Sequence, residues 1–175
     1  MIVTRRALAD DAFAIAVIHV ESWQAVYRGL MPSEILDRLD VAERTEMWRK
    51  VLAGFGSDVL VVDDGSGQIA GFCSLIRSGD ADSDSKTGEI AAIYVDPRRW
   101  RIGLGAALLG DALKLAQARD FIQVTLWVLD ANLGARRFYE RAGFRLDGLE
   151  KMENRWGTFS VREVRYRLPI ASGAT

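Results

Sequence analysis

The connection between a buried strand and a helix at residues 89–119 constrains this chain more than any other feature. An apolar, β-branched run ends at Val95, Pro97 interrupts it, and Gly103 and Gly105 begin a leucine-rich helix. Backbone N–H groups at a helix N-terminus attract anions, and glycine lets a phosphate approach the backbone because it has no Cβ. Three arginines add positive charge to the same connection: Arg98, Arg99 and Arg101. The segment therefore predicts a loop that binds a multiply charged anion.

Two familiar nucleotide-binding loops fit this segment poorly. A Walker loop has Lys after its last glycine, whereas Asp111 follows Gly110 here. A Rossmann fingerprint has a third glycine where this chain has Leu108, and its turn after the strand is shorter. Two alternatives stay open at this point. The glycines could serve only to pack the helix closely on the strand, or the same amides could belong to another nucleotide-binding domain.

The rest of the chain interleaves strands and helices. Strands are expected at residues 2–8, 58–62, 69–76, 89–95, 121–129, 144–152 and 159–168, and helices at 10–20, 21–30, 34–39, 41–52, 103–119 and 132–142. Residues 77–88 are rich in Asp, Ser and Gly and are predicted to form a mobile loop. This order predicts the α/β class, with one domain over residues 1–170 and a frayed tail at 171–175.

Composition narrows the range of functions. Apolar residues make up 49% of the chain, enough for a packed core, and the net charge of −1 argues against a general nucleic-acid binder. Cys73 and His19 are the only cysteine and histidine, so neither a disulfide within the chain nor a zinc site is expected. The longest early apolar run, residues 12–18, is too short to span a bilayer, and no signal peptide is recognised. We therefore expect a soluble cytoplasmic protein with no metal, membrane or nucleic-acid partner.

A second motif follows the strand expected at residues 121–129. It begins at Asn132 and contains Phe138-Tyr139 and Gly143-Phe144. Together with Val95-Asp96-Pro97 and the glycine loop, it closely resembles the GNAT superfamily of N-acetyltransferases, with the motifs in the expected order over residues 89–144. One departure is Trp100, which stands where Arg or Gln is usual and leaves the backbone amides unchanged.

The resemblance extends toward the N-terminus. Ser22-Trp23-Gln24 and Tyr27-Arg28-Gly29 are similar to segments of a bacterial subgroup of the same superfamily. What the resemblance implies is the GNAT acyl-CoA N-acyltransferase fold, a mixed, mostly antiparallel sheet of about six or seven strands with helices on both faces.

The resemblance also implies a donor site. Acetyl-CoA, the co-substrate, would lie between the strands at residues 89–95 and 121–129. The residues that would contact it are Ile93, Tyr94, Val95, Arg101, Ile102, Gly103, Leu104, Gly105, Ala106, Asn132 and Tyr139.

The implied reaction is acetyl transfer to a primary amine of a small molecule, a peptide N-terminus or a lysine. Tyr139 would protonate the departing thiolate, and Glu89 would accept the proton of the amine. A solvated carboxylate at the end of a strand remains the alternative reading of Glu89. Cys73 has no visible base beside it, so transfer is expected to be direct, in a ternary complex.

The acceptor is less well specified. Trp23 and Tyr27 would border its site, where aromatic rings can hold an amine by cation–π attraction, although core packing is the alternative for both. Members of the superfamily are often dimers, so a homodimer is compatible with the resemblance. The second hypothesis for the function is a catalytically inactive, CoA-binding sensor or interaction module.

Overall fold

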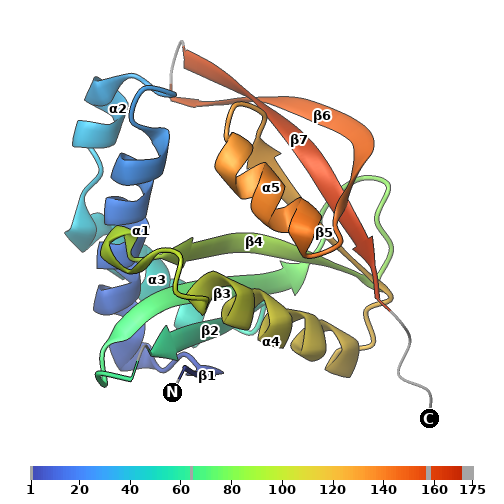
Figure 1. Ribbon diagram of the computed structural model, residues 1–175, viewed down its shortest axis with the longest axis horizontal. Coiled ribbons are helices and arrows are strands. Elements are labelled where there is room, and N and C mark those ends of the chain that lie inside the picture. The colour runs from blue at the N-terminus through green and yellow to red at the C-terminus, as the bar shows by residue number, and fades with distance from the viewer. Residues whose placement is uncertain (1, 64, 157–158, 171–175) are drawn as a thin grey trace.

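Among the described residues, seven strands form one sheet in the order β1-β2-β3-β4-β5-β7-β6 (Figure 1). The computed structural model describes residues 2–63, 65–156 and 159–170, so the tail expected at residues 171–175 lies outside the described residues. The strands are β1 (Val3–Arg6), β2 (Ser57–Asp63), β3 (Ile69–Arg77), β4 (Thr87–Val95), β5 (Gln123–Leu129), β6 (Arg145–Trp156) and β7 (Phe159–Pro169). β4 and β5 run parallel, and the other neighbouring strands run antiparallel. The expected mixed, mostly antiparallel sheet is therefore confirmed.

Helices cover both faces of this sheet (Figure 1). The α-helices are α1 (Ala12–Tyr27), α2 (Ser33–Asp37), α3 (Val41–Ala53), α4 (Leu104–Ala118) and α5 (Leu133–Arg141), and the short 3-10 helices are η1 (Ala9–Asp11) and η2 (Pro97–Arg99). α1 and α3 pack on one face of the sheet, and α4 and α5 pack on the other. Within the described ranges, no helix has the length and apolar character of a membrane span.

The two helices expected at residues 10–20 and 21–30 are one helix, so that prediction is wrong. No glycine or proline interrupts the chain between Ala12 and Tyr27, and Ile15, Ile18 and other small or apolar side chains keep one face buried throughout. The helix ends before Gly29, whose φ of 82° suits a residue without a side chain.

A hydrophobic core lies on each side of the sheet. On the α4 and α5 side, Leu108, Phe144 and Tyr166 are fully buried. On the α1 and α3 side, Trp48 and Phe72 are buried, and the Trp48 indole Nε1 donates a hydrogen bond of 3.1 Å to His19 Nδ1. Burial lowers the pKa of His19 to about 3, with a smaller contribution from the charge of Arg44. His19 is therefore a neutral, satisfied core residue.

The segment between β3 and β4, expected to be mobile, is tied to the sheet. Arg165 on β7 is 1% exposed, and its guanidinium donates to Asp80 at 2.9 Å, to Asp82 at 2.6 and 2.7 Å and to Asp147 at 2.7 Å. Asp80 also accepts a hydrogen bond of 3.2 Å from the Trp127 indole on β5. The buried guanidinium therefore fixes this polar segment over β5 and β7.

Candidate functional site

A gap opens between β4 and β5. The two strands pair only at their first residues, from Thr87 opposite Gln123 to Glu89 opposite Thr125. Beyond Glu89, β4 continues to pair on its other edge with β3, as far as Val95. A shift in that register leaves Ala91 as a bulge, which bends β4 away from its parallel neighbour. The β5-facing backbone groups in the second half of β4 therefore have no strand partner in the described sheet.

α5 lies beside this gap and carries two of the predicted site residues. The Asn132 side chain accepts a hydrogen bond of 3.1 Å from the Ala135 amide, so Asn132 caps the helix. Tyr139 is 8% exposed and packs against Phe144. Burial raises the pKa of Tyr139 well above its ordinary value, and the nearby Tyr94 hydroxyl and Cys73 thiol raise it further. The phenol therefore keeps its proton at neutral pH and can serve as a proton donor.

The glycine loop joins the wide end of the gap to α4. Arg101 and Gly103 have φ values of 66° and 93°, in the left-handed region that redirects the chain into the helix. α4 has no side-chain cap at Gly103, so its first amides, those of Leu104, Gly105 and Ala106, project from the helix end. Amides and a helix dipole at such a helix end attract anions, and this end lies next to the gap.

Trp100 braces this loop. Its indole Nε1 donates a hydrogen bond of 2.8 Å to the Val95 carbonyl oxygen, which also accepts one of 3.1 Å from the Ser22 hydroxyl on α1. Asp96 caps the start of η2, because its carboxylate accepts a hydrogen bond of 2.9 Å from the Arg98 amide. The Trp100 side chain therefore ties the loop back to the end of β4.

Trp23 and Tyr27 lie together on α1 and face β4. The Trp23 indole donates a hydrogen bond of 2.9 Å to the Tyr94 hydroxyl, and the Tyr27 ring meets the Trp23 ring edge-on at 5.0 Å between centroids. Burial raises the pKa of Tyr27, and the Tyr94 hydroxyl adds to the effect. Tyr94 therefore directs its side chain toward α1.

Glu89 lies where the gap begins. Burial raises the pKa of Glu89, and the negative charge of Asp80 raises it further, while Lys151, Ser78 and Arg165 act in the opposite direction. A half-buried carboxylate with a raised pKa is suited to accept a proton near neutral pH. Cys73 differs, since it is fully buried and burial raises the pKa of its thiol to about 12. A cysteine thiolate is therefore unavailable at neutral pH.

Two features of this region were not recognised in the sequence. Arg136 on α5, which the sequence suggests is solvated, donates a hydrogen bond of 3.0 Å to the Tyr166 hydroxyl and another of 3.0 Å to the Asp130 carbonyl oxygen. Trp127, Lys151 and Glu163 form a polar cluster on the face of β5, β6 and β7 that is opposite α5. Alternation along the strands places each of these side chains on a face, but long-range register decides which of them meet.

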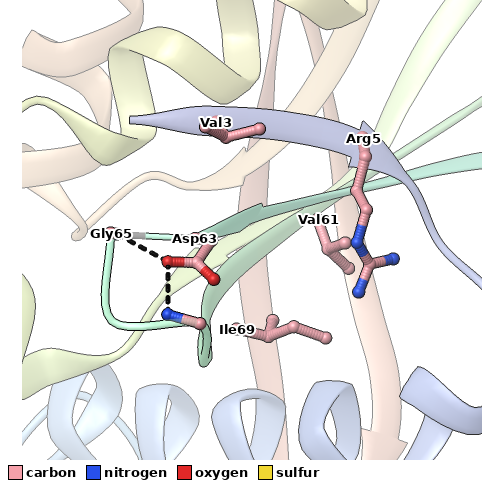
Figure 2. A pocket seen from close by; sticks show the side chains of 7 residues that line it. Val3, Arg5, Val61, Asp63, Gly65 and Ile69 are labelled. Atoms are coloured by element: carbon pink, nitrogen blue, oxygen red, sulfur yellow. Dashed lines mark hydrogen bonds between the residues drawn. The ribbon is translucent and has the colours of Figure 1, made fainter. Parts of the chain in front are cut away.

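A separate hollow of about 280 Å³ lies at the edge of the sheet (Figure 2). Its lining comes from β1, β2 and the β2–β3 connection: Val3, Arg5, Val61, Asp63, Gly65, Gly67 and Ile69. The Asp63 carboxylate in this hollow accepts hydrogen bonds from the amides of Gly65 and Gly67, and Arg5 pairs with Asp11. None of the predicted site residues lines it, so we do not place the chemistry there.

Known proteins share both the sequence pattern and the fold. Residues 23–144 match the family model of the acetyltransferase (GNAT) family. The uncharacterized N-acetyltransferase YuaI of Bacillus subtilis is 33% identical over 135 residues, which cover 75% of this chain and 74% of YuaI.

Two solved structures superpose on the chain. The PaiA N-acetyltransferase of Thermoplasma acidophilum, in complex with coenzyme A, is 20% identical with a TM-score of 0.71, over 93% of this chain and 98% of that one. YncA of Salmonella typhimurium, with its cofactor acetyl-CoA, is 21% identical with a TM-score of 0.74, over 100% and 97% of the two chains. The chain therefore belongs to the acetyltransferase (GNAT) family and shares its fold and enzyme class.

Proposed function

We propose that this protein transfers the acetyl group of acetyl-CoA to a primary amine by direct attack within a ternary complex. The observation that carries this proposal is the gap between β4 and β5 next to the uncapped end of α4. Backbone amides of β4 that have no partner on β5 can bind an extended acyl-pantetheine arm, and the helix end beside them suits a pyrophosphate. The two structural neighbours that hold coenzyme A or acetyl-CoA support the same donor.

The donor contacts proposed from the sequence fit this geometry. Backbone groups of Ile93, Tyr94 and Val95 line the open edge of β4, and those of Arg101, Ile102 and Gly103 lead into the helix. The amides of Leu104, Gly105 and Ala106 would bind the pyrophosphate, while Asn132 and Tyr139 would border the arm from α5.

Three groups of this chain would carry the chemistry. Glu89 accepts a proton from the attacking amine, directly or through water, because its raised pKa matches that task. The unpaired amides of β4 stabilise negative charge on the carbonyl oxygen. Tyr139, on α5 beside the gap, donates its proton to the departing thiolate sulfur, and the phenolate then recovers a proton from solvent. Direct transfer follows because Cys73 offers no thiolate.

The acceptor side is formed by α1 and by the face of the sheet opposite α5. Trp23 and Tyr27 form one wall of it, and we propose that the Ser22-Trp23-Gln24 and Tyr27-Arg28-Gly29 segments mark a bacterial subgroup that builds its acceptor site from this helix end. A small-molecule amine, a peptide N-terminus and a lysine are the acceptor types to be tested. We further propose a cytoplasmic protein, without a nucleic-acid partner, whose single domain of residues 1–170 can form a homodimer.

Release of free thiol from acetyl-CoA, measured with amines of each type, tests the transferase proposal. Suitable acceptors are an alkylamine, a peptide with a free N-terminus and an N-terminally blocked peptide with one lysine. We expect acetylated product from at least one of them, with turnover reduced in Glu89→Gln and Tyr139→Phe variants. Tight binding of acetyl-CoA without product from any amine would instead support the CoA-binding sensor.

A further inference from the structure

An ammonium group of the protein itself lies on the proposed acceptor side. The Nζ atom of Lys151, on β6, is 4.2 Å from the centroid of the Trp127 ring on β5. The same nitrogen is 3.4 Å from Oε2 of Glu163 on β7. Lys151 and Glu163 are partners in the β6–β7 register, whereas Trp127 is on the far side of β7. Because neighbouring strands are about 4.8 Å apart, the lysine side chain crosses β7 in the direction of the gap.

Trp127 places this ammonium beside the proposed chemistry. It follows Thr125, the partner of Glu89, by two residues, so the Trp127 side chain is on the same face of β5 as that of Thr125. Val124, Leu126 and Val128 face the opposite core, under α4 and α5. The indole is therefore on the acceptor side of the sheet, two residues after Thr125, where the pairing of β5 with β4 ends.

Glu163 connects the same position to the aromatic wall. Its charge adds to the effect of burial in raising the pKa of Tyr27 and of Tyr94. Leu129, the partner of Glu163 in the β5–β7 register, packs with Trp23 and Tyr27, so this part of β7 lies close to the α1 aromatics. An aromatic face and a carboxylate that bind one cation are a recurring way to recognise ammonium groups.

Lys151 is held more loosely than the structural cation nearby. The Lys151 side chain is 38% exposed and that of Glu163 is 23% exposed. Arg165, by contrast, is almost fully buried and bound by three carboxylates. Lys151 can therefore move into solvent, and another ammonium group can replace it without leaving an uncompensated charge.

We propose that the Trp127 ring and the Glu163 carboxylate form an ammonium site for the acceptor, and that Lys151 occupies this site until a cationic amine displaces it. The inference rests on the proposed transferase function and specifies its substrate class. The acceptor is an alkylammonium compound that arrives protonated, close to Glu89. A neutral molecule of similar shape lacks the charge attraction to the carboxylate and the cation–π attraction to the ring.

Tetramethylammonium and tert-butanol are matched probes for this site, because they are similar in size and shape and only the first carries a positive charge. Neither can be acetylated at nitrogen, so their binding is measured by saturation-transfer NMR without reference to turnover. We expect the cation to bind, and to bind at least about threefold more tightly to a Lys151→Met variant, since the competing ammonium is gone. Adding Glu163→Gln or Trp127→Leu to that variant should remove the gain.

A second measurement uses the unmodified protein. The chain has four lysines, Lys50, Lys86, Lys114 and Lys151, so their ¹³Cε signals are easily assigned. Tetramethylammonium should shift the Lys151 signal and leave Lys114, on the exposed side of α4, unchanged. No shift at Lys151, or equal binding of cation and neutral probe, would overturn the inference. Calorimetry with coenzyme A separates the two proposals. A protein that binds coenzyme A but shows no cation site would leave the transferase proposal standing, whereas a protein that does not bind coenzyme A would count against both proposals.

Discussion

Replacing Arg165 by methionine is expected to lower the free energy of unfolding by about 3–5 kcal/mol. The guanidinium is 1% exposed and is the shared partner of Asp80, Asp82 and Asp147. Methionine fills a similar volume but removes the cation that the three carboxylates share, and leaves Asp82 and Asp147 with Arg167 alone. The magnitude is that of breaking a buried ion pair by removing one partner, because the charges left behind are costly.

Arg167→Met is the matched control. Its guanidinium is 27% exposed and lies 3.2 Å from the same Asp82 and Asp147 carboxylates. Because solvent screens an exposed pair, we expect a loss below about 1 kcal/mol. Urea denaturation followed by circular dichroism measures the loss of stability in both variants. Similar, small losses in the two variants would refute the reasoning that burial of Arg165 makes its network important.

The stability that Arg165 contributes depends on pH. Hydrogen bonding to Arg165 holds the pKa of Asp82 below its usual range. Burial alone would raise the pKa of Asp147, but the Leu149 amide and the two arginines lower it overall. Carboxylates with lowered pKa values stabilise the fold above about pH 4 and lose that contribution as the pH falls through their folded-state pKa values. The difference between wild type and Arg165→Met should therefore shrink in acid.

Three further predictions concern the core and the proposed chemistry. Leu108→Ala should lower the free energy of unfolding, measured in urea, by about 2–5 kcal/mol, because this side chain of α4 is fully buried against the sheet. Asp80→Asn should move the acidic limb of the kcat/KM profile to lower pH, because it removes a negative charge that raises the pKa of Glu89; an unmoved limb would argue against Glu89 as the base. Tyr139→Phe should reduce kcat by about 10²–10⁴-fold while coenzyme A affinity is kept; an unchanged kcat would exclude the phenol as proton donor.

Local patterns were sufficient to predict the strand, the glycine loop and α4. The change from a β-branched run to Pro97 and then to two glycines is a short-range signal, and the observed elements follow it closely. The same holds for Asn132, whose capping role depends only on an amide three residues away. The roles of these residues in binding acetyl-CoA remain predictions.

The gap itself could not be predicted from local patterns. It depends on a bulge at Ala91 and on β5 pairing with only the first three residues of β4, which are properties of register between strands far apart in sequence. The anchoring of the segment between β3 and β4, which was expected to be mobile, also depends on a contact between residues far apart in sequence. Its polar composition is visible in the sequence, but its anchor, Arg165, lies 85 residues after Asp80. The contact of Arg136 with Tyr166 is likewise not visible in local sequence, because Tyr166 is on β7.

The amides at the start of α4 are the proposed binding site for the pyrophosphate of acetyl-CoA. Calorimetric titration with coenzyme A, acetyl-CoA and ATP tests it most directly, with Gly105→Trp as the blocking variant. A Cβ at Gly105 would make only ordinary contact with Phe138 and Val95, so α4 can carry a side chain there, and circular dichroism checks that the variant is folded. Gly110→Trp, on the same helix with open space around it, is the matched control.

We expect micromolar binding of both CoA compounds, weaker binding of ATP, loss of binding in Gly105→Trp and retention in Gly110→Trp. Binding that survives in a folded Gly105→Trp variant, or absence of coenzyme A binding in the wild type, would contradict the claim.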